Sequence, residues 1–135
     1  QQMGKTMRSA AATTGELTLR TLAMPGDANA AGDIFGGWVM SQVDVAGSIA
    51  AMRRTRSRVV TVAVNSFVFL QPITTQYLVS FYASVARVGN TSITVDVTVY
   101  AETGYENIQI KKVAEATLTY VAVGEEGQKL NIPKD

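Results

Sequence analysis

The sequence predicts an α+β fold in which one long central helix is wrapped by a five-stranded antiparallel sheet. Three observations support this prediction. A single segment carries a helical repeat of apolar residues, and the segments around it have the alternation or the apolar runs of strands. The last four strands are joined by short turns, which favours antiparallel pairing. The chain has 135 residues, of which 47% are apolar, which suits one domain with a continuous core.

Three elements are predicted in the first part of the chain. Apolar and polar residues alternate at 16–24, which indicates a strand. Residues 25–35 are rich in Pro, Gly, Asp and Asn, which indicates a structured loop. The helix is expected from Gly36 to about Arg54, because apolar residues recur there at helical spacing. Its apolar stripe consists of Val39, Val43, Ala46 and Ala50.

Four strands are expected after the helix, at residues 58–70, 77–88, 92–100 and 108–123. The first of them is apolar on both faces, which is typical of a central strand that is covered on both sides. The third alternates cleanly, with Ile93, Val95, Val97 and Val99 facing the core. We expect these four strands to form an antiparallel meander, to which the strand at 16–24 can pair at either side.

The domain boundaries follow from where this patterning begins and ends. We interpret residues 1–15 as a flexible tail, residues 16–123 as a single domain, and residues 124–135 as a polar C-terminal tail. One helix leaves apolar sheet surface and two strand edges uncovered. Because such surfaces usually acquire a partner, we expect at least a homodimer.

The composition excludes several classes of chemistry. The chain has no cysteine and no histidine, which excludes disulfides, thiolate nucleophiles, Ser-His-Asp triads and most catalytic zinc sites. We therefore expect no metal, and chemistry based on carboxylates, hydroxyls, amides and backbone groups. The net charge of +1 gives no electrostatic signature of binding to nucleic acid or to an anionic membrane. With no visible signal peptide or membrane-spanning run, a cytoplasmic protein is expected.

Two features of the predicted helix point to chemistry. Gly36 and Gly37 open the helix and leave backbone amides at its positive end, where they can hold a developing oxyanion; alternatively, they let the loop turn into the helix. Asp44 lies in mid-helix on a small polar stripe with Ser41 and Ser48, where a buried carboxylate is costly unless it is paired or functional. The alternative is a solvated helix face, or a buried aspartate satisfied by neighbouring donors.

Three longer strings carry a family resemblance: GDIFGGWVMSQVDVAGSIAA, RVVTVAVNSFVFLQPI and RVGNTSITVDVTVYAE, in this order. Together they resemble the small acyl-CoA thioesterases of the hotdog superfamily, and most of all the YciA-like bacterial acyl-CoA hydrolases. The similarity runs from about residue 21 to residue 123. It implies the hotdog fold and hydrolysis of acyl-CoA to a free carboxylic acid and coenzyme A. No cofactor is implied, because coenzyme A is part of the substrate.

The resemblance also implies roles for residues around the helix. Asp44 matches a helix carboxylate that acts as nucleophile or general base, and Gly36 and Gly37 match glycines whose amides polarise the thioester carbonyl. Asp33 matches a position at the mouth of the site, although it also suits an N-terminal cap or a partner of the helix dipole. Ser48, one turn beyond Asp44, matches a hydroxyl that orients the attacking water.

Six further residues are predicted to bind substrate: Asn29, Asn65, Arg58, Arg87, Thr91 and Ser92. By the resemblance, Arg58 and the hairpin that contains Thr91 and Ser92 are implied to lie near the nucleotide part of coenzyme A. Arg87 is a candidate because it precedes this hairpin and coenzyme A carries phosphates. The alternative for the arginines after the helix is a solvated helix end. Asn65 is placed to reach the acyl side, or to satisfy a buried backbone group. Asn29 belongs to the motif that precedes the helix.

The spacing of Gly36 and Asp44 adds a prediction about assembly. Eight residues of helix separate them by about 12 Å along the axis, whereas catalytic groups must lie within about 3.5 Å of the reacting atoms. We therefore expect two composite sites in each homodimer, with Asp33 and the glycine amides from one chain and Asp44 from the other. By resemblance, the full assembly is a trimer of dimers.

Other functions compete with this one. A hotdog dehydratase acting on acyl carrier protein needs a catalytic histidine, which the chain lacks. A non-catalytic acyl-CoA-binding hotdog module is the alternative, and the presence of Asp44 together with Gly36 and Gly37 argues against it. A purely structural oligomer-forming domain would not require the polar stripe on the helix.

Overall fold

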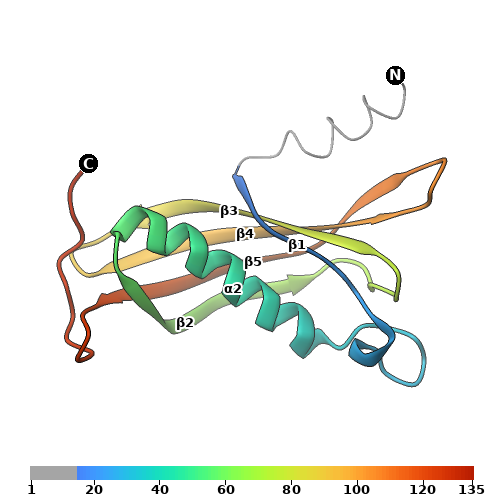
Figure 1. Ribbon diagram of the computed structural model, residues 1–135, viewed down its shortest axis with the longest axis horizontal. Coiled ribbons are helices and arrows are strands. Elements are labelled where there is room, and N and C mark those ends of the chain that lie inside the picture. The colour runs from blue at the N-terminus through green and yellow to red at the C-terminus, as the bar shows by residue number, and fades with distance from the viewer. Residues whose placement is uncertain (1–14) are drawn as a thin grey trace.

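The computed structural model describes residues 15–135, so the predicted flexible tail lies, except for Gly15, outside the described residues. The observed elements are β1 (Glu16–Leu22), the 3-10 helix η1 (Pro25–Asp27), α2 (Gly36–Thr55), β2 (Arg58–Phe69), β3 (Leu78–Val88), β4 (Ser92–Thr103) and β5 (Gln109–Val123). Figure 1 shows α2 running along one face of a five-stranded sheet. The predicted α+β class is confirmed.

The order of the strands corrects one prediction. The sheet has the order β1-β3-β4-β5-β2, and all four pairings are antiparallel. The consecutive hairpins therefore include only β3, β4 and β5, because β2 pairs with β5 rather than with β3. β1 pairs with β3 at the opposite edge of the sheet.

β2 is consequently an edge strand, and the prediction of a covered central strand at residues 58–70 is wrong. Several of its apolar side chains are exposed, and Val62 reaches 55%. The pattern predicted burial on both sides, but within this single chain β2 has one unpaired edge and exposed apolar side chains. A long apolar strand with one unpaired edge is a surface that soluble proteins normally cover with a partner.

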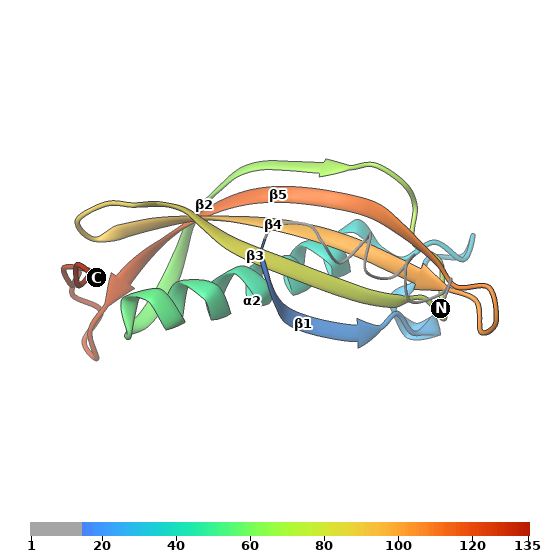
Figure 2. The ribbon, with the colours of Figure 1, turned by 90° about the horizontal axis from the view of Figure 1, so that it is seen from above.

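The packing of α2 follows its sequence pattern. The predicted stripe of Val39, Val43, Ala46 and Ala50 is buried to 6% exposure or less and faces the sheet. The four predicted inward residues of β4 are buried to 1% or less against it. Figure 2 shows the strands arching over one side of the helix, with β1 curving past it. These apolar contacts fix which side of α2 is left open.

The two ends of α2 differ in how they are capped. At the start, Phe35 is the N-cap residue, and its side chain makes no capping hydrogen bond. At the end, Arg56 adopts the left-handed conformation with φ 57°, and its amide donates to the carbonyl of Met52. Arg53 and Arg54 lie in the last turn, as predicted, where their charge complements the helix dipole. At the end of the helix the carbonyl of Met52 is therefore paired, whereas at its start no side chain of residues 15–135 caps the first amides.

The segment after β5 folds back on the domain. The amide of Leu130 donates to the carbonyl of Ala122, and the amide of Ile132 donates to the carbonyl of Asn90. Ile132 is only 7% exposed and belongs to the core. The predicted polar tail thus packs against the turn of the β3–β4 hairpin and the end of β5.

Candidate active site

Asp44 lies half-buried in the middle of α2, on the side that faces the β2 edge. Thr61 of β2 donates its hydroxyl to the Asp44 carboxylate, with 2.7 Å between Thr61 Oγ1 and Asp44 Oδ1. The residue is therefore not on a freely solvated helix face. Thr61 was not among the predicted site residues. The signal available for it was a hydroxyl within the apolar run RVVTVAV.

Tyr120 holds the backbone at Asp44 from the other strand. It is the cross-strand neighbour of Thr61, so both side chains lie on the same face of the sheet. Its hydroxyl donates to the Asp44 carbonyl at 2.9 Å. Burial, together with the nearby Asp44, raises the pKa of Tyr120, so the hydroxyl keeps its proton and stays a donor at physiological pH. Strands β2 and β5 thus each donate one hydrogen bond to Asp44, one to its side chain and one to its main-chain carbonyl.

Gly47 makes this approach possible. It is buried in α2, and a Cβ built at this position would overlap the Tyr120 hydroxyl and lie 3.2 Å from Tyr120 Cζ. Any larger residue would push the helix away from the sheet just below Asp44. The glycine therefore serves close packing and not backbone flexibility.

Gly47→Ala is expected to lower the free energy of unfolding by about 1–3 kcal/mol, because the added methyl overpacks the contact with Tyr120. Tyr120→Phe should cost about 1 kcal/mol, since it removes one hydrogen bond. The double variant should cost less than the sum of the two, because the hydroxyl that clashes is gone. Gly37→Ala, where a Cβ meets nothing within 4 Å, is the control in the same helix. Urea denaturation followed by circular dichroism measures all four proteins, and additive losses would contradict this account.

The start of α2 presents open backbone amides. Within residues 15–135, the amides of Gly36 and Gly37 have no hydrogen-bond acceptor. A Cβ at Gly37 would point into open space, whereas a Cβ at Gly36 would lie 3.3 Å from the Phe69 ring. A ligand oxygen can therefore approach Gly37 through open space at the positive end of the helix dipole, whereas the Phe69 ring borders Gly36.

The loop before α2 is closed by Asn29. Its side-chain oxygen accepts hydrogen bonds from the backbone amides of Ala31 (2.9 Å) and Asp33 (3.1 Å). Its backbone amide donates to the Asp33 carbonyl. Because the oxygen accepts two hydrogen bonds from the loop, the side-chain NH₂ group of this exposed residue is the part that can donate to a ligand. Asp33 does not cap the helix, so the alternative of a cap is wrong; Phe35 takes that position.

Asn65 and Ser48 were also predicted to belong to the site, and only Asn65 is placed differently. Asn65 lies in a β-bulge of β2 and accepts a hydrogen bond from Thr119, which faces away from α2. The bulge shifts the alternation by one residue, so Asn65 points to the outer face and the prediction that it reaches the acyl side is wrong. Ser48 donates its hydroxyl to the Val45 carbonyl within the helix, at 2.7 Å.

The predicted nucleotide-binding residues gather at the end of the sheet where α2 terminates. Arg58 is the first residue of β2, and Thr91 and Ser92 lie at the start of β4. Both strands pair here with the end of β5, which brings these residues close together. Arg87 is exposed near the end of β3. Arg58 makes one weak contact of 3.4 Å to the Gly124 carbonyl.

The two arginines of the last helical turn are engaged within the chain. Arg53 forms a salt bridge with Glu16, and Arg54 donates to the Pro133 carbonyl and lies 3.6 Å from the Asp135 carboxylate. Exposed pairs of this kind stabilise little. Because Arg53 and Arg54 already have partners within the chain, Arg58 and Arg87 are the better candidates for binding phosphate.

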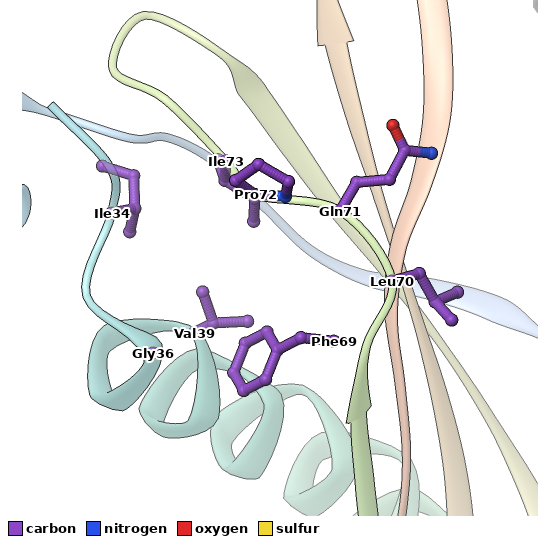
Figure 3. A pocket seen from close by; sticks show the side chains of 8 residues that line it. All are labelled: Ile34, Gly36, Val39, Phe69, Leu70, Gln71, Pro72 and Ile73. Carbon is purple, nitrogen blue, oxygen red and sulfur yellow. The ribbon is translucent and has the colours of Figure 1, made fainter. Parts of the chain in front are cut away.

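A pocket of about 380 Å³ opens beside the start of α2, and we call it the helix-start pocket (Figure 3). It is lined by Ile34, Gly36, Val39, Phe69, Leu70, Gln71, Pro72 and Ile73. In Figure 3 the side chains of Val39 and Phe69 point into it, and those of Leu70 and Gln71 point away. The pocket therefore has an apolar interior and shares Gly36 with the open amides.

The described residues limit what else the site can hold. Within residues 15–135, no three acidic side chains gather closely enough to bind a metal ion. Among the helices of this same part of the chain, none has the length and apolar character that crossing a membrane requires.

Comparisons with known proteins give the chain a family context. A family model described as the thioesterase superfamily matches residues 31–108. The acyl-CoA thioester hydrolase YciA of Salmonella typhimurium is 46% identical over 121 residues, which cover 88% of this chain and 91% of that protein. The solved structure of an Asp-to-Ala variant of HI0827, a hexameric broad specificity acyl-coenzyme A thioesterase, matches with a TM-score of 0.86 at 43% identity, covering 90% of this chain and 89% of that one.

A further solved structure shares the fold. Cj0915 of Campylobacter jejuni, described as a hexameric hotdog fold thioesterase, matches with a TM-score of 0.84 at 43% identity. The match covers 88% of this chain and 91% of that one. The arrangement of α2 against the sheet is thus the hotdog fold, which confirms what the resemblance in the sequence implied.

Proposed function

The chain belongs to the thioesterase superfamily and, within it, to the acyl-CoA thioester hydrolases, and we propose that it hydrolyses acyl-CoA at composite sites formed by two copies of the chain. The observation that carries this proposal is the separation of Gly36 and Asp44 on one straight helix. They are about 12 Å apart along the axis, so one thioester cannot contact both within a single subunit. The reaction needs the two groups together.

The dimer we propose pairs two chains across a two-fold axis, with their α2 helices antiparallel. Each Gly36–Gly37 start then faces the partner's Asp44. The unpaired edge and exposed apolar side chains of β2 support this arrangement, because they border Asp44 and lack cover within the chain. The hexamers described for HI0827 and Cj0915 support a further assembly of three such dimers.

The chemistry follows from the groups that meet there. The amides of Gly36 and Gly37 and the NH₂ of Asn29 donate to the thioester oxygen and stabilise the charge that develops on it. Asp44 of the partner either takes a proton from the attacking water or attacks the carbonyl carbon itself, forming a mixed anhydride that water then hydrolyses. The oxyanion collapses, the C–S bond breaks, and coenzyme A leaves as a thiolate that takes up a proton. Asp33 lies at the mouth of this site, beside Asn29.

Coenzyme A itself extends away from the reacting carbon. We place its phosphates near Arg58 and Arg87, at the end of α2, which is about 16 Å along the helix axis from Asp44. Thr91 and Ser92 supply hydroxyls at the same end. We expect no further cofactor, and we expect the enzyme to act in the cytoplasm.

The function is tested by measuring thiol release from short, long and aromatic acyl-CoA substrates. We expect steady turnover with release of one thiol per ester cleaved. The alternative, a non-catalytic acyl-CoA-binding module, predicts saturable binding of acyl-CoA without release of thiol above the buffer rate. The second result would overturn the assignment as an enzyme.

Thr61→Val is expected to lower kcat by about 10- to 100-fold, because it removes a hydrogen bond to a charged group that is worth about 1.5–3 kcal/mol. Thr117→Val is the matched control, since Thr117 donates to the Asp96 carboxylate at the same 2.7 Å on the outer face of the sheet. The control should keep normal turnover. Steady-state kinetics of both variants compare the two threonines, and an equal effect would argue against a role for Thr61 at Asp44.

A further inference from the structure

The turn of α2 that carries Asp44 is tied to three strands, each through one hydroxyl group. Thr61 of β2 donates to the carboxylate, and Tyr120 of β5 donates to the main-chain carbonyl. Thr18 of β1 donates to the carbonyl of Ala46, with 3.0 Å between Thr18 Oγ1 and the carbonyl oxygen. Because helical geometry already supplies a carbonyl in mid-helix with an amide four residues later, the bonds from β1 and β5 are additional to those that the helix needs. They fix the place of this turn against the sheet.

The three donors differ in how firmly they are held and in what they hold. Tyr120 is 0% exposed, so its ring is locked by close packing, and Gly47 lets its hydroxyl reach the helix backbone. Thr61 lies exposed on the edge strand, and its hydroxyl reaches the side chain of Asp44. Thr18 is half-buried and holds the main chain two residues further on. Of the three, Tyr120 is therefore the donor that combines a rigid position with the main chain of Asp44.

The position of the acting carboxylate oxygen depends on two restraints. Oδ1 of Asp44 accepts the Thr61 hydroxyl, so Oδ2 is the oxygen that can act on the substrate. Where Oδ2 lies is set by the torsion of the side chain, which Thr61 restrains, and by the main chain from which the side chain projects, which Tyr120 restrains. A displacement of about 1 Å at a reacting group can lower a rate by about 100-fold. Both restraints therefore matter for a group that has to meet a thioester.

We propose that Tyr120 is a positioning residue for Asp44, whose hydroxyl holds the main chain of this turn and so sets where the acting carboxylate oxygen meets the thioester at the start of the partner's α2. This inference rests on the proposed function, because it concerns the same reaction. Tyr120 lies in the core and acts through Asp44, so its loss lowers kcat and leaves KM unchanged. A role in packing alone would lower stability and leave the kcat of the folded protein as it is.

The first test compares Tyr120→Phe with Thr18→Val. Each variant removes one hydroxyl that donates to a carbonyl in mid-helix and nearly keeps the side-chain volume, but the carbonyls belong to different residues. We expect kcat of Tyr120→Phe to fall by about 3- to 10-fold, the equivalent of one hydrogen bond, with KM unchanged. The factor should be the same for butyryl-CoA and decanoyl-CoA, since the reacting carbonyl is common to both. Thr18→Val should keep both constants. Thiol release is measured at a temperature at which circular dichroism shows each protein to be folded.

The second test asks whether the effect passes through Asp44. Tyr120→Phe is introduced into Thr61→Val, in which the carboxylate has lost its own restraint, and into Thr117→Val, whose hydroxyl donates on the outer face. A carboxylate that is free to rotate gains little from a fixed main chain, so the loss of kcat caused by Tyr120→Phe should be smaller in Thr61→Val. In Thr117→Val it should keep its full size. A factor in Thr61→Val that is as large as in Thr117→Val, or larger, overturns the route through Asp44.

The outcomes separate this inference from the function on which it rests. If wild type releases no thiol from either acyl-CoA, the proposed function fails. If wild type is active but Tyr120→Phe keeps its kcat, or Thr18→Val loses as much, the positioning role is overturned and the function stands. Gly47→Ala displaces the same contact from the side of the helix, so it should also lower kcat at unchanged KM. Wild-type kcat in folded Gly47→Ala would likewise contradict the role of this contact.

Discussion

Replacing Asp44 by asparagine is expected to lower kcat by about 10²- to 10⁴-fold while leaving the fold intact. Asparagine has nearly the same shape and still accepts the Thr61 hydroxyl, but it can neither take a proton from water nor attack the thioester as a carboxylate. Because Asp44 is only half-buried and its backbone carbonyl keeps the bond from Tyr120, unfolding by urea should occur at nearly the same concentration.

The control for this prediction is Asp96→Asn. Asp96 also accepts a threonine hydroxyl at 2.7 Å, but it lies on β4 and faces away from α2. It therefore reproduces the loss of charge and the change in hydrogen bonding without touching the proposed site. Thiol release by Asp96→Asn should equal that of wild type. If Asp44→Asn also hydrolyses as fast as wild type, Asp44 takes no part in the chemistry.

The sequence predicted the elements whose partners lie within the chain. The stripe of α2 through Val39 and Ala50 and the alternation of β4 both arise from burial in one core, so local patterning was sufficient to find them. The same reasoning failed for β2. Its apolar side chains indicate burial, but a pattern of hydrophobicity does not distinguish cover from the same chain from cover by a second copy.

The candidate site was predictable in part for a similar reason. Asp44, Gly36 and Gly37 share one helix, where their spacing is fixed by the helical rise. Thr61 meets Asp44 only because β2 pairs with β5 at a particular register, which a local pattern does not specify. Asn65 was misplaced because a bulge shifts the alternation of the strand. The role of Gly47 emerged only with the position of Tyr120.

Complementation between subunits should have the second large effect. Gly37→Pro removes one of the open amides at a position in the first helical turn, where proline is tolerated, and by itself should lower kcat by about 10²- to 10³-fold. Heterodimers of Asp44→Asn with Gly37→Pro chains, isolated with two different affinity tags, should recover about half of wild-type activity. In a shared arrangement, one site of each such dimer carries both defects and the other carries neither.

The reciprocal heterodimer makes the test decisive. It pairs a wild-type chain with a chain that carries both Asp44→Asn and Gly37→Pro. If the sites are shared, each site receives one defective group and activity stays near that of the single variants. If each site lay within one chain, the wild-type chain would keep its own site and this dimer would be half active, whereas the first heterodimer would be inactive. The heterodimer that is half active in one model is therefore inactive, or nearly so, in the other. Thiol release from both heterodimers, measured at equal concentration, determines whether Gly36 and Asp44, about 12 Å apart in one chain, act together through a second subunit.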